Sequence, residues 1–494
     1  MPVELEVNQV TWIQPTQLFI NNEFKDAVKK NTLETIDPST GKVIANVQLA
    51  TAEDVDIAVC CSRKAFNKVW KNTCGSDRGK LLIKLSELTE KYGELLATIE
   101  AMDSGKPMYT NALGDIEECA SIYRYYGGIA DKIEGKVSMD DPLALSYTRR
   151  EPFGVVGAII PWNYPLATAS WKIAPALAAG NCIVLKVAEN TPLSMLYFAN
   201  LVVEAGFPPG VINIITGTGQ EVGAKLSSHM DVDKLTFTGS TAVGQKILQA
   251  AAVSNLKDCT LELGGKSPLI VFEDCDLDQA AKWAYEGIMY NMGQICCGTS
   301  RLLVHESVHD KFVEFLLDVI ARKSVAGDVF DKNTTHGPQI SSAHLQKIKG
   351  YVECAKNEGA IVACGGAQWG EKGYYFLPTI LLNVKPGDTV DQEEIFGPVA
   401  SVTKFKTYEE AISIANNTKY GLGGAVFTND IAKGHKAAND IVTGYVWINS
   451  SNDQDYHLPF TGHKMSGIGS ELGTTGIEGY LKLKSVQVNL GKRI

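Results

Sequence analysis

The chain has 494 residues, of which 45% are hydrophobic and 21% charged, and its formal net charge is −10. This length exceeds what one hydrophobic core usually serves, so we expect two or three domains. The composition is that of a folded protein and argues against a largely disordered chain. The acidic balance, with no basic run beyond Lys492-Arg493, argues against a nucleic-acid-binding protein.

Eleven cysteines are scattered between Cys60 and Cys364, without the spacing of a zinc site. The first residues, 1–7, are acidic and lack the order of charge and apolar run that marks a signal peptide. We therefore expect no disulfide framework, no bound metal and a cytoplasmic location.

The segment 154–185 carries Lys172 as its only charged residue, but Pro161, Asn163 and Pro165 argue against a membrane span. Its pattern predicts a βαβ unit. The expected order is strand 155–160, turn 161–165, buried helix 166–179, a stop at Gly180 and strand 182–187.

The alternation continues toward the C-terminus, which predicts a parallel, doubly wound sheet. The expected elements of this part are helix 192–205, strand 211–215, a helix opened by the glycine-rich segment 217–223, and strand 234–237. After Gly265 a second α/β region is expected, with strands 268–272, 301–305 and 399–405 and helices 277–290, 310–322, 343–358 and 408–417.

Two glycine-rich turns precede helices and leave backbone N–H groups free for a phosphate: Gly217-Thr-Gly219 and Gly239-Ser240-Thr241. Neither has the spacing of the usual dinucleotide fingerprint, so each is a weak signal alone. Glu189 strengthens the case, because an acid after a strand can bind both ribose hydroxyls. The alternative is that Glu189 is only a helix N-terminal charge.

Two other segments offer a thiol and a carboxylate: Asn291-Met-Gly-Gln-Ile-Cys296-Cys297 and Leu261-Glu262-Leu-Gly-Gly-Lys266. A cysteine nucleophile with a glutamate base points to covalent chemistry on a carbonyl group. Taken singly, Cys296 is as well explained as a small buried residue, Glu262 as a strand-end carboxylate and Asn163 as a turn residue.

Together these segments closely resemble the aldehyde dehydrogenase superfamily along almost the whole chain, and specifically its broad-substrate, hydrolytic branch. The matching motifs are Pro161-Trp162-Asn163-Tyr164-Pro165, Lys186-Val-Ala-Glu189, Phe237-Thr-Gly239-Ser240-Thr241, Leu261-Glu262-Leu-Gly-Gly-Lys266, Gly293-Gln294-Ile-Cys296, Glu394-Ile-Phe396-Gly-Pro398 and Lys464-Met-Ser-Gly467.

The resemblance implies that Cys296 attacks an aldehyde and passes through thiohemiacetal and thioester intermediates. Asn163 and the Cys296 backbone N–H then hold the oxyanion, and Glu262 activates the water that releases a carboxylic acid. Cys297 is a neighbour that can form a disulfide with Cys296 under oxidation.

The resemblance also implies NAD as the cofactor. Its implied contacts are Gly239 and Ser240 for the pyrophosphate, Lys186 and Glu189 for the adenine ribose, Glu394 and Phe396 for the nicotinamide side, and Trp162 and Gly219 along the groove. The charge of Glu189 favours NAD over NADP, because a carboxylate repels a 2′-phosphate.

The implied substrate tunnel is lined by Tyr164, Thr168, Trp171 and Phe460, with residues 452–456 near its mouth. Small aliphatic aldehydes are the expected substrates. Aminoaldehydes are the alternative, because Asp453 and Asp455 lie in the mouth segment and aromatic rings attract cations. Thr461 and Ser470 depart from the family pattern, which has glycine and arginine there, so altered substrate fit or weaker assembly is expected.

The implied architecture has a dinucleotide-binding domain (1–131 and 152–264), a catalytic domain (265–465) and a small β extension (132–151 and 480–494) that builds a homotetramer. Two other classes remain open. A cysteine hydrolase would turn over esters without NAD, and a non-catalytic protein that keeps the fold would be expected to lack Cys296 or Glu262.

Overall fold

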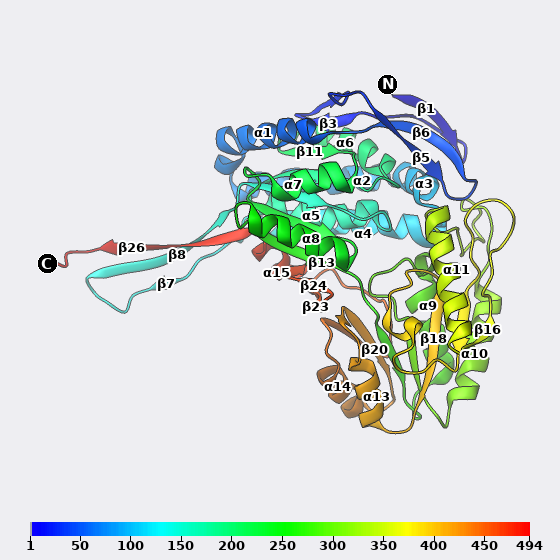
Figure 1. Ribbon diagram of the computed structural model, residues 1–494. Helices are drawn as coiled ribbons and strands as arrows, with labels where there is room; N and C mark the ends of the chain where they lie inside the picture. The colour runs from blue at the N-terminus through cyan, green and yellow to red at the C-terminus, as the bar shows by residue number, and fades with distance from the viewer. Residues whose placement is uncertain (1) are drawn as a thin grey trace.

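The computed structural model describes residues 2–494, and two helix-flanked β-sheets form its body (Figure 1). The first sheet has eight strands within the described residues, in the order β24-β13-β12-β9-β10-β11-β3-β4. Their bounds are β24 (Gly467–Ile468), β13 (Asp258–Glu262), β12 (Lys234–Thr238), β9 (Val155–Ile159), β10 (Cys182–Lys186), β11 (Ile212–Ile215), β3 (Leu18–Ile20) and β4 (Glu23–Lys25).

The five central strands of this sheet are parallel, whereas β24 and β3 join its edges antiparallel. The doubly wound parallel core is therefore as the sequence predicts, and the antiparallel edges are an addition. They come from the first and last parts of the chain, whose pairing depends on contacts across more than 190 residues.

Both faces of the central strands are buried, as expected for a parallel sheet covered on two sides. Along β10, Ile183 and Leu185 face one helical layer and Val184 faces the other. The first layer contains α2 (Gly75–Lys91), α3 (Gly93–Ser104), α4 (Leu113–Ile129), α5 (Pro165–Ala178) and α6 (Leu193–Ala205), and the second contains α1 (Ala52–Lys68), α7 (Ala224–Ser228) and α8 (Thr241–Val253).

Helix α5 shows how the sequence sets local structure. Pro165 begins it, where a missing backbone N–H costs nothing, and Gly180 follows its end with φ +95°. The glycine-rich segment 217–223 behaves differently from the prediction of a plain helix start. It forms a wide helical turn (Gly219–Gly223) before the short helix α7.

The second sheet has the order β16-β17-β18-β15-β14-β20-β21, with all neighbours parallel except β16 and β17. Its strands are β16 (Ile361–Cys364), β17 (Thr379–Leu382), β18 (Val399–Phe405), β15 (Arg301–His305), β14 (Pro268–Val271), β20 (Gly423–Phe427) and β21 (Tyr445–Ile448). The helices that cover it are α9 (Leu277–Met289), α10 (His309–Lys323), α11 (Ser342–Asn357), α12 (Thr389–Gln392), α13 (Tyr408–Asn416) and α14 (Ile431–Asp440).

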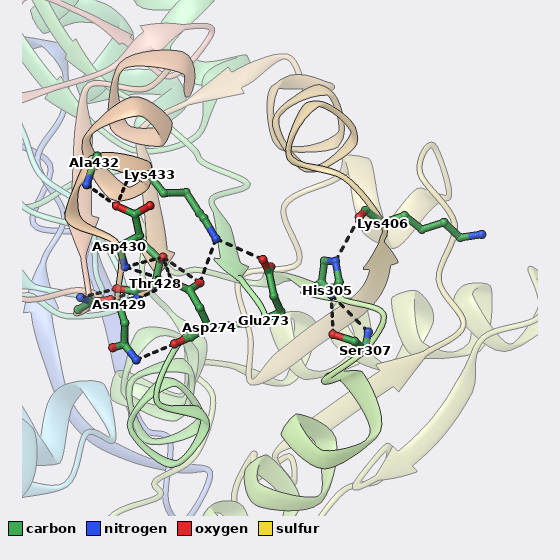
Figure 2. Close-up of polar contacts among 11 residues, drawn as sticks. Glu273, Asp274, His305, Ser307, Lys406, Thr428, Asn429, Asp430, Ala432 and Lys433 are labelled. Atoms are coloured by element: carbon green, nitrogen blue, oxygen red, sulfur yellow. Dashed lines mark hydrogen bonds and ion pairs between the residues drawn. The ribbon is translucent and has the colours of Figure 1, made fainter.

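A polar cluster ties together the turns that follow β14 and β20 (Figure 2). The Asp274 carboxylate accepts hydrogen bonds from the Thr428 hydroxyl and from the backbone N–H groups of Asn429 and Asp430. The Lys433 ammonium bridges Asp274 (3.2 Å) and Glu273 (3.3 Å). Because these partners surround Asp274, the cluster holds together the turns at the carboxyl ends of β14 and β20.

The chain returns to the first sheet after β21. The last part contains β22 (Phe460–Thr461), β23 (His463–Lys464), β25 (Ser470–Glu471) and α15 (Gly473–Glu478), and β23 pairs with β19 (Tyr420–Gly421). The Ser466 hydroxyl donates to the Gly264 carbonyl (2.7 Å) and accepts from the Gly421 N–H (2.9 Å). Ser466 of the Lys464–Gly467 motif therefore joins the segment that follows β13 of the first sheet to β19, which precedes β20 of the second sheet.

An arm projects from the body, on the left of Figure 1, and consists of β7 (Val137–Ser138), β8 (Ala144–Pro152) and β26 (Leu481–Asn489). Strands β8 and β26 pair antiparallel over their full length. Apolar side chains on the arm are exposed, including Val137 at 66% and Leu483 at 70%.

The remaining strands form two hairpins near the N-terminus, β1 (Val3–Val7) with β2 (Val10–Gln14) and β5 (Thr32–Asp37) with β6 (Lys42–Gln48). Single helical turns lie at Trp70–Asn72, Met108–Ala112 and Tyr290–Gly293. Among residues 2–494, the helices are all too short or too polar to cross a bilayer.

Candidate active site

A cavity of about 720 Å³ lies where the carboxyl ends of β9, β12 and β13 meet the loop before β15. All three predicted catalytic residues line it: Asn163, Glu262 and Cys296. The predicted tunnel residues Tyr164, Thr168, Trp171 and Phe460 also line it, as do the predicted cofactor residues Trp162, Gly239, Ser240, Glu394 and Phe396. Lys186, Glu189 and Gly219 are not part of its lining.

Cys296 follows a strained loop rather than a continuation of α9. Asn291, Met292 and Gly293 have φ values of +45°, +54° and +72°. The left-handed conformation costs roughly 1–2 kcal/mol for a residue with a side chain, so packing must impose it. A β-carbon at Gly293 would lie 2.1 Å from the Gly397 carbonyl oxygen, which explains the glycine.

The Asn163 amide fixes the position of this loop. It donates to the Gln294 carbonyl (2.9 Å), and the Asn291 amide donates to the Asn163 carbonyl (3.1 Å). The side chain of Gln294 accepts the Ile340 N–H (3.0 Å). Because an amide NH₂ group has two donors, Asn163 keeps a second N–H for an oxyanion beside Cys296.

Glu262 is the last residue of β13 and is 2% exposed. Neither of its carboxylate oxygens has a hydrogen-bond partner among residues 2–494. Burial raises the pKa of Glu262, the nearby Glu471 carboxylate raises it further, and the Lys172 ammonium opposes the rise. A buried carboxyl with free oxygens and a raised pKa is suited to take a proton from water.

Lys172 and Glu471 form a buried ion pair close to Glu262. Lys172 also donates to the hydroxyls of Thr238 (2.8 Å) and Thr236 (3.2 Å). The sequence marks Lys172 as the only charged residue of segment 154–185, but no spacing signal connects Lys172 or Glu471 with Glu262.

The two adjacent cysteines differ in burial. Cys297 is buried and its thiol donates to Asn452 Oδ1 (3.1 Å), whereas Cys296 is partly exposed to the cavity. A hydrogen bond with the Cys297 thiol and burial raise the pKa of Cys296. Cys296 is therefore the accessible sulfur, and it rests as a thiol until its proton is removed.

A glycine pair packs between the thiol loop and Glu394. A β-carbon at Gly265 would lie 2.2 Å from the Cys296 carbonyl oxygen, and one at Gly264 would lie 2.6 Å from the Glu394 carboxylate. The Gly265 N–H donates to Glu394 (2.9 Å), and burial raises the pKa of Glu394 to about 7. Close backbone approach therefore accounts for both glycines.

Glu189 forms a separate cluster at the carboxyl ends of β10 and β11. Its carboxylate accepts the Gly219 N–H (2.6 Å) and lies 3.3 Å from the Lys186 ammonium, whose pKa burial lowers. The two predicted adenine-ribose residues, Lys186 and Glu189, therefore lie together with Gly219, which was predicted to line the groove. At the start of α8, Ser240 makes no side-chain capping bond, so the first N–H groups of this helix are available for a phosphate. These residues fit a dinucleotide.

A model of the aldehyde dehydrogenase family matches residues 24–486 of this chain. The chain belongs to the aldehyde dehydrogenase family. It is 51% identical over 478 residues to an aldehyde dehydrogenase of Alternaria alternata, a match that covers 97% of this chain and 96% of the relative. It is also 48% identical over 497 residues to aldehyde dehydrogenase 1, NAD(P)+, of Saccharomyces cerevisiae, which covers 99% and 98% of the two chains.

The NAD+ complex of an aldehyde dehydrogenase from Bacillus cereus has the same fold, with a TM-score of 0.95 and 45% identity over 97% of each chain. The protein is therefore an oxidoreductase that acts on aldehydes with NAD as its cofactor. The family, the fold and the cofactor expected from the sequence are confirmed.

The cavity wall around the predicted tunnel residues is aromatic and acidic. Besides the predicted tunnel residues, its wall includes Asp115, Glu118, Trp283, Glu286 and Tyr290. The indole of Trp171 donates to Glu118 (3.0 Å). Asp115 and Glu118, three residues apart on α4, lie on one face of that helix. No motif or spacing in the sequence connects this pair with the catalytic motifs, which are distant from it along the chain.

One sequence expectation about the mouth, the part played by Asp455, needs correction. Asn452 and Asp453 line the cavity, but the Asp455 carboxylate instead pairs with the His457 imidazole (2.6 Å). Asp455 is already paired because His457, two residues later, lies within its reach.

Thr461 and Ser470, the two departures from the family pattern, compensate for each other. They are opposite one another in the β22–β25 pair, and their hydroxyls are hydrogen-bonded at 2.7 Å. Thr461 lies in an extended strand, which accommodates its side chain.

Proposed function

We propose that this enzyme oxidises aldehydes to carboxylic acids through a covalent intermediate on Cys296, with Glu262 as the base. The observation that carries the proposal is the shared cavity, in which an accessible thiol and an unpartnered buried carboxyl lie with the Asn163 amide. Each of the three groups has the chemistry that one part of the reaction requires.

In this mechanism the Cys296 thiol gives its proton to water, and the sulfur then attacks the aldehyde carbon. The second N–H of Asn163 and the Cys296 backbone N–H hold the oxygen of the thiohemiacetal. Bound NAD would supply the hydride acceptor, and loss of hydride from the thiohemiacetal carbon leaves a thioester on Cys296. Glu262 then takes a proton from water, which attacks the thioester and frees the acid and the thiol.

The residues that would hold NAD are those at the carboxyl edge of the first sheet and around Glu394. Gly239 and Ser240 are proposed for the pyrophosphate, Lys186 and Glu189 for the adenine ribose, and Glu394 and Phe396 for the nicotinamide side. Trp162 and Gly219 are proposed to line the same groove. The free N–H groups at the start of α8 and the Glu189 carboxylate support this assignment.

Glu189→Gln is expected to raise the ratio of kcat/KM for NADP to that for NAD by about tenfold. The amide keeps an acceptor for the Gly219 N–H but removes the charge that repels a 2′-phosphate, an effect on the order of 1.4 kcal/mol. Steady-state kinetics with both cofactors would measure it. An unchanged ratio would show that Glu189 does not discriminate between NAD and NADP.

For the substrate we propose small aliphatic aldehydes, supported by the aromatic side chains around Cys296. The acidic wall favours a second candidate, an aminoaldehyde. Asp115, Glu118, Glu286 and Asp453 line the cavity, and Lys106 pairs with Asp115. An ammonium group at this end would meet carboxylates and ring faces.

NADH formation from butanal and from 4-aminobutanal separates the two candidates. In Glu118→Gln, the carbonyl of the new amide still accepts the Trp171 indole N–H. If the ammonium binds here, kcat/KM for 4-aminobutanal falls about tenfold, while that for butanal changes little. Equal effects on both substrates would exclude a charge contact at Glu118. No NADH from any aldehyde would overturn the proposed function itself.

The domain division expected from the sequence is also a proposal, with the two sheets as the cores of the cofactor-binding and catalytic domains. We further propose a homotetramer in the cytoplasm, assembled through the arm. The exposed apolar side chains and the free edges of β7 and β26 support pairing with another copy. Sedimentation of full-length protein and of a variant lacking 482–494 would test this role of the arm.

A further inference from the structure

His344 lies at the start of α11 and reaches the cofactor side of the cavity. Ser341 caps this helix by accepting the His344 N–H (3.2 Å). The His344 ring lines the cavity, and its Nε2 hydrogen-bonds the Phe396 carbonyl at 2.6 Å. Since a carbonyl only accepts, Nε2 carries the proton in this contact.

The residue that His344 holds has an unusual backbone. Phe396 has a φ of +63°, which a bulky side chain adopts only where its surroundings impose it. The next residue, Gly397, packs against Ile348, one turn after His344 on α11. A β-carbon at Gly397 would lie 2.5 Å from the Ile348 side chain. One face of α11 therefore clamps the 396–397 turn.

The ring of His344 also completes an aromatic group with Trp162 and Phe396. The ring centroids of His344 and Trp162 are 5.4 Å apart, those of Trp162 and Phe396 are 5.4 Å apart, and those of His344 and Phe396 are 6.1 Å apart. All three contacts are edge-to-face, the geometry that aromatic rings prefer. His344 thus contacts Phe396 both through its carbonyl and through its ring.

Burial keeps this imidazole neutral near physiological pH. It lowers the pKa of His344 to about 4, the bond to the Phe396 carbonyl opposes that shift, and the Lys347 ammonium adds to it. A neutral ring donates one N–H and does not bring a charge to the nicotinamide side.

We propose that His344 is a positioning residue, which fixes Phe396 and Trp162 in the arrangement that receives the nicotinamide end of NAD. It is assigned no contact with the reacting atoms. The proposal rests on the assignment of Phe396 and Trp162 to the cofactor. Its consequence is that the loss of the Nε2 donor weakens NAD binding while the thiol chemistry of Cys296 persists.

Three substitutions at His344 distinguish the contribution of the Nε2 donor from that of the aromatic ring. His344→Gln keeps an N–H donor at a similar reach, His344→Phe keeps a ring without the donor, and His344→Leu has neither. His336 offers a matched control, because it is also buried and its Nε2 contacts a backbone carbonyl, that of Phe376, at 2.8 Å. His336→Leu removes the same kind of bond away from the cavity lining.

The dissociation constant for NAD is measured by calorimetry, and KM for NAD and kcat with butanal are measured by NADH formation. We expect about tenfold weaker NAD binding and a higher KM in His344→Phe and His344→Leu. His344→Gln should stay within about threefold of wild type for the same reason. Hydrolysis of 4-nitrophenyl acetate without NAD reports that Cys296 and the fold are intact, and it should persist in every variant.

Unchanged NAD binding in His344→Phe and His344→Leu would overturn the proposal. So would an equal loss in His336→Leu, because the effect would then follow from any buried histidine, or a loss of ester hydrolysis in step with NAD affinity. Wild-type protein that binds NAD but oxidises no aldehyde would instead contradict the proposed function, and the calorimetric comparison would still decide the role of His344.

Discussion

Replacing Cys296 with alanine is expected to reduce NADH formation by at least about 10³-fold, because Cys296 is the accessible thiol, whereas Cys297, which also lines the cavity, is buried and donates to Asn452. The side chain is small and partly exposed to the cavity, so alanine leaves the surrounding packing almost unchanged. NAD affinity measured by calorimetry should therefore remain close to that of wild type. This combination of lost turnover and retained binding identifies a nucleophile.

Cys297→Ala is the matched control, since the two sulfurs are adjacent and are joined by a hydrogen bond. The Cys297 thiol is buried and donates to Asn452, so its loss should leave turnover at the same order as wild type. It should also lower the pKa of Cys296, because the hydrogen bond that raises it is gone. If Cys297→Ala were the inactive variant and Cys296→Ala the active one, the assignment would be reversed.

Glu262→Gln is expected to lower steady-state turnover by about 10²–10⁴-fold while leaving a first burst of NADH. Attack by Cys296 and the loss of hydride precede hydrolysis, so one NADH per active site should still form. Rapid-mixing absorbance would show the burst, and mass spectrometry would show the acyl group on Cys296. Loss of the burst together with turnover would mean that Glu262 acts before the thioester forms.

The carboxyl group of Glu262 also determines how the rate of thioester hydrolysis in the wild-type enzyme depends on pH. A base works only when unprotonated, and burial together with the Glu471 charge raises the pKa of Glu262. Hydrolysis of the thioester should therefore be slow at acidic pH and rise as the pH passes the raised pKa. Glu262→Gln has no such group, so the rise should vanish from its hydrolysis rate. If the hydrolysis rate of Glu262→Gln rose with pH by the same factor as that of wild type, the pH dependence would belong to another group.

Much of the local structure was predictable because nearby residues decide it. The buried runs around β9 and β10, Pro165 at the start of α5 and Gly180 after its end each act over a few residues. Expected bounds of the main strands and helices therefore agree with the structure to within one or two residues. The wide turn at Gly219–Gly223 escaped prediction, because glycine permits several conformations and packing selects one.

The cavity could be predicted only in part. The three predicted catalytic residues lie in motifs that resemble those of the family, and the structure places all three in one cavity: Asn163, Glu262 and Cys296. His344 and Glu118 lie in ordinary helical sequence. Their roles depend on contacts with Phe396 and Trp171, which are more than 50 residues away in each case.

The sequence by itself determined the family and the alternation of strands and helices, and it pointed to the thiol, the carboxyl and the cofactor residues that the proposed mechanism uses. Only the tertiary structure decided that Glu262 is unpartnered beside a buried Lys172–Glu471 pair, that Thr461 meets Ser470, and that α11 holds Phe396 in a left-handed turn. The physical reason is the separation along the chain between the residues that interact. Helix caps, turns and buried strands are fixed by neighbours along the chain, whereas a pKa, a hydrogen bond across the core or an imposed backbone angle depends on residues that folding brings together.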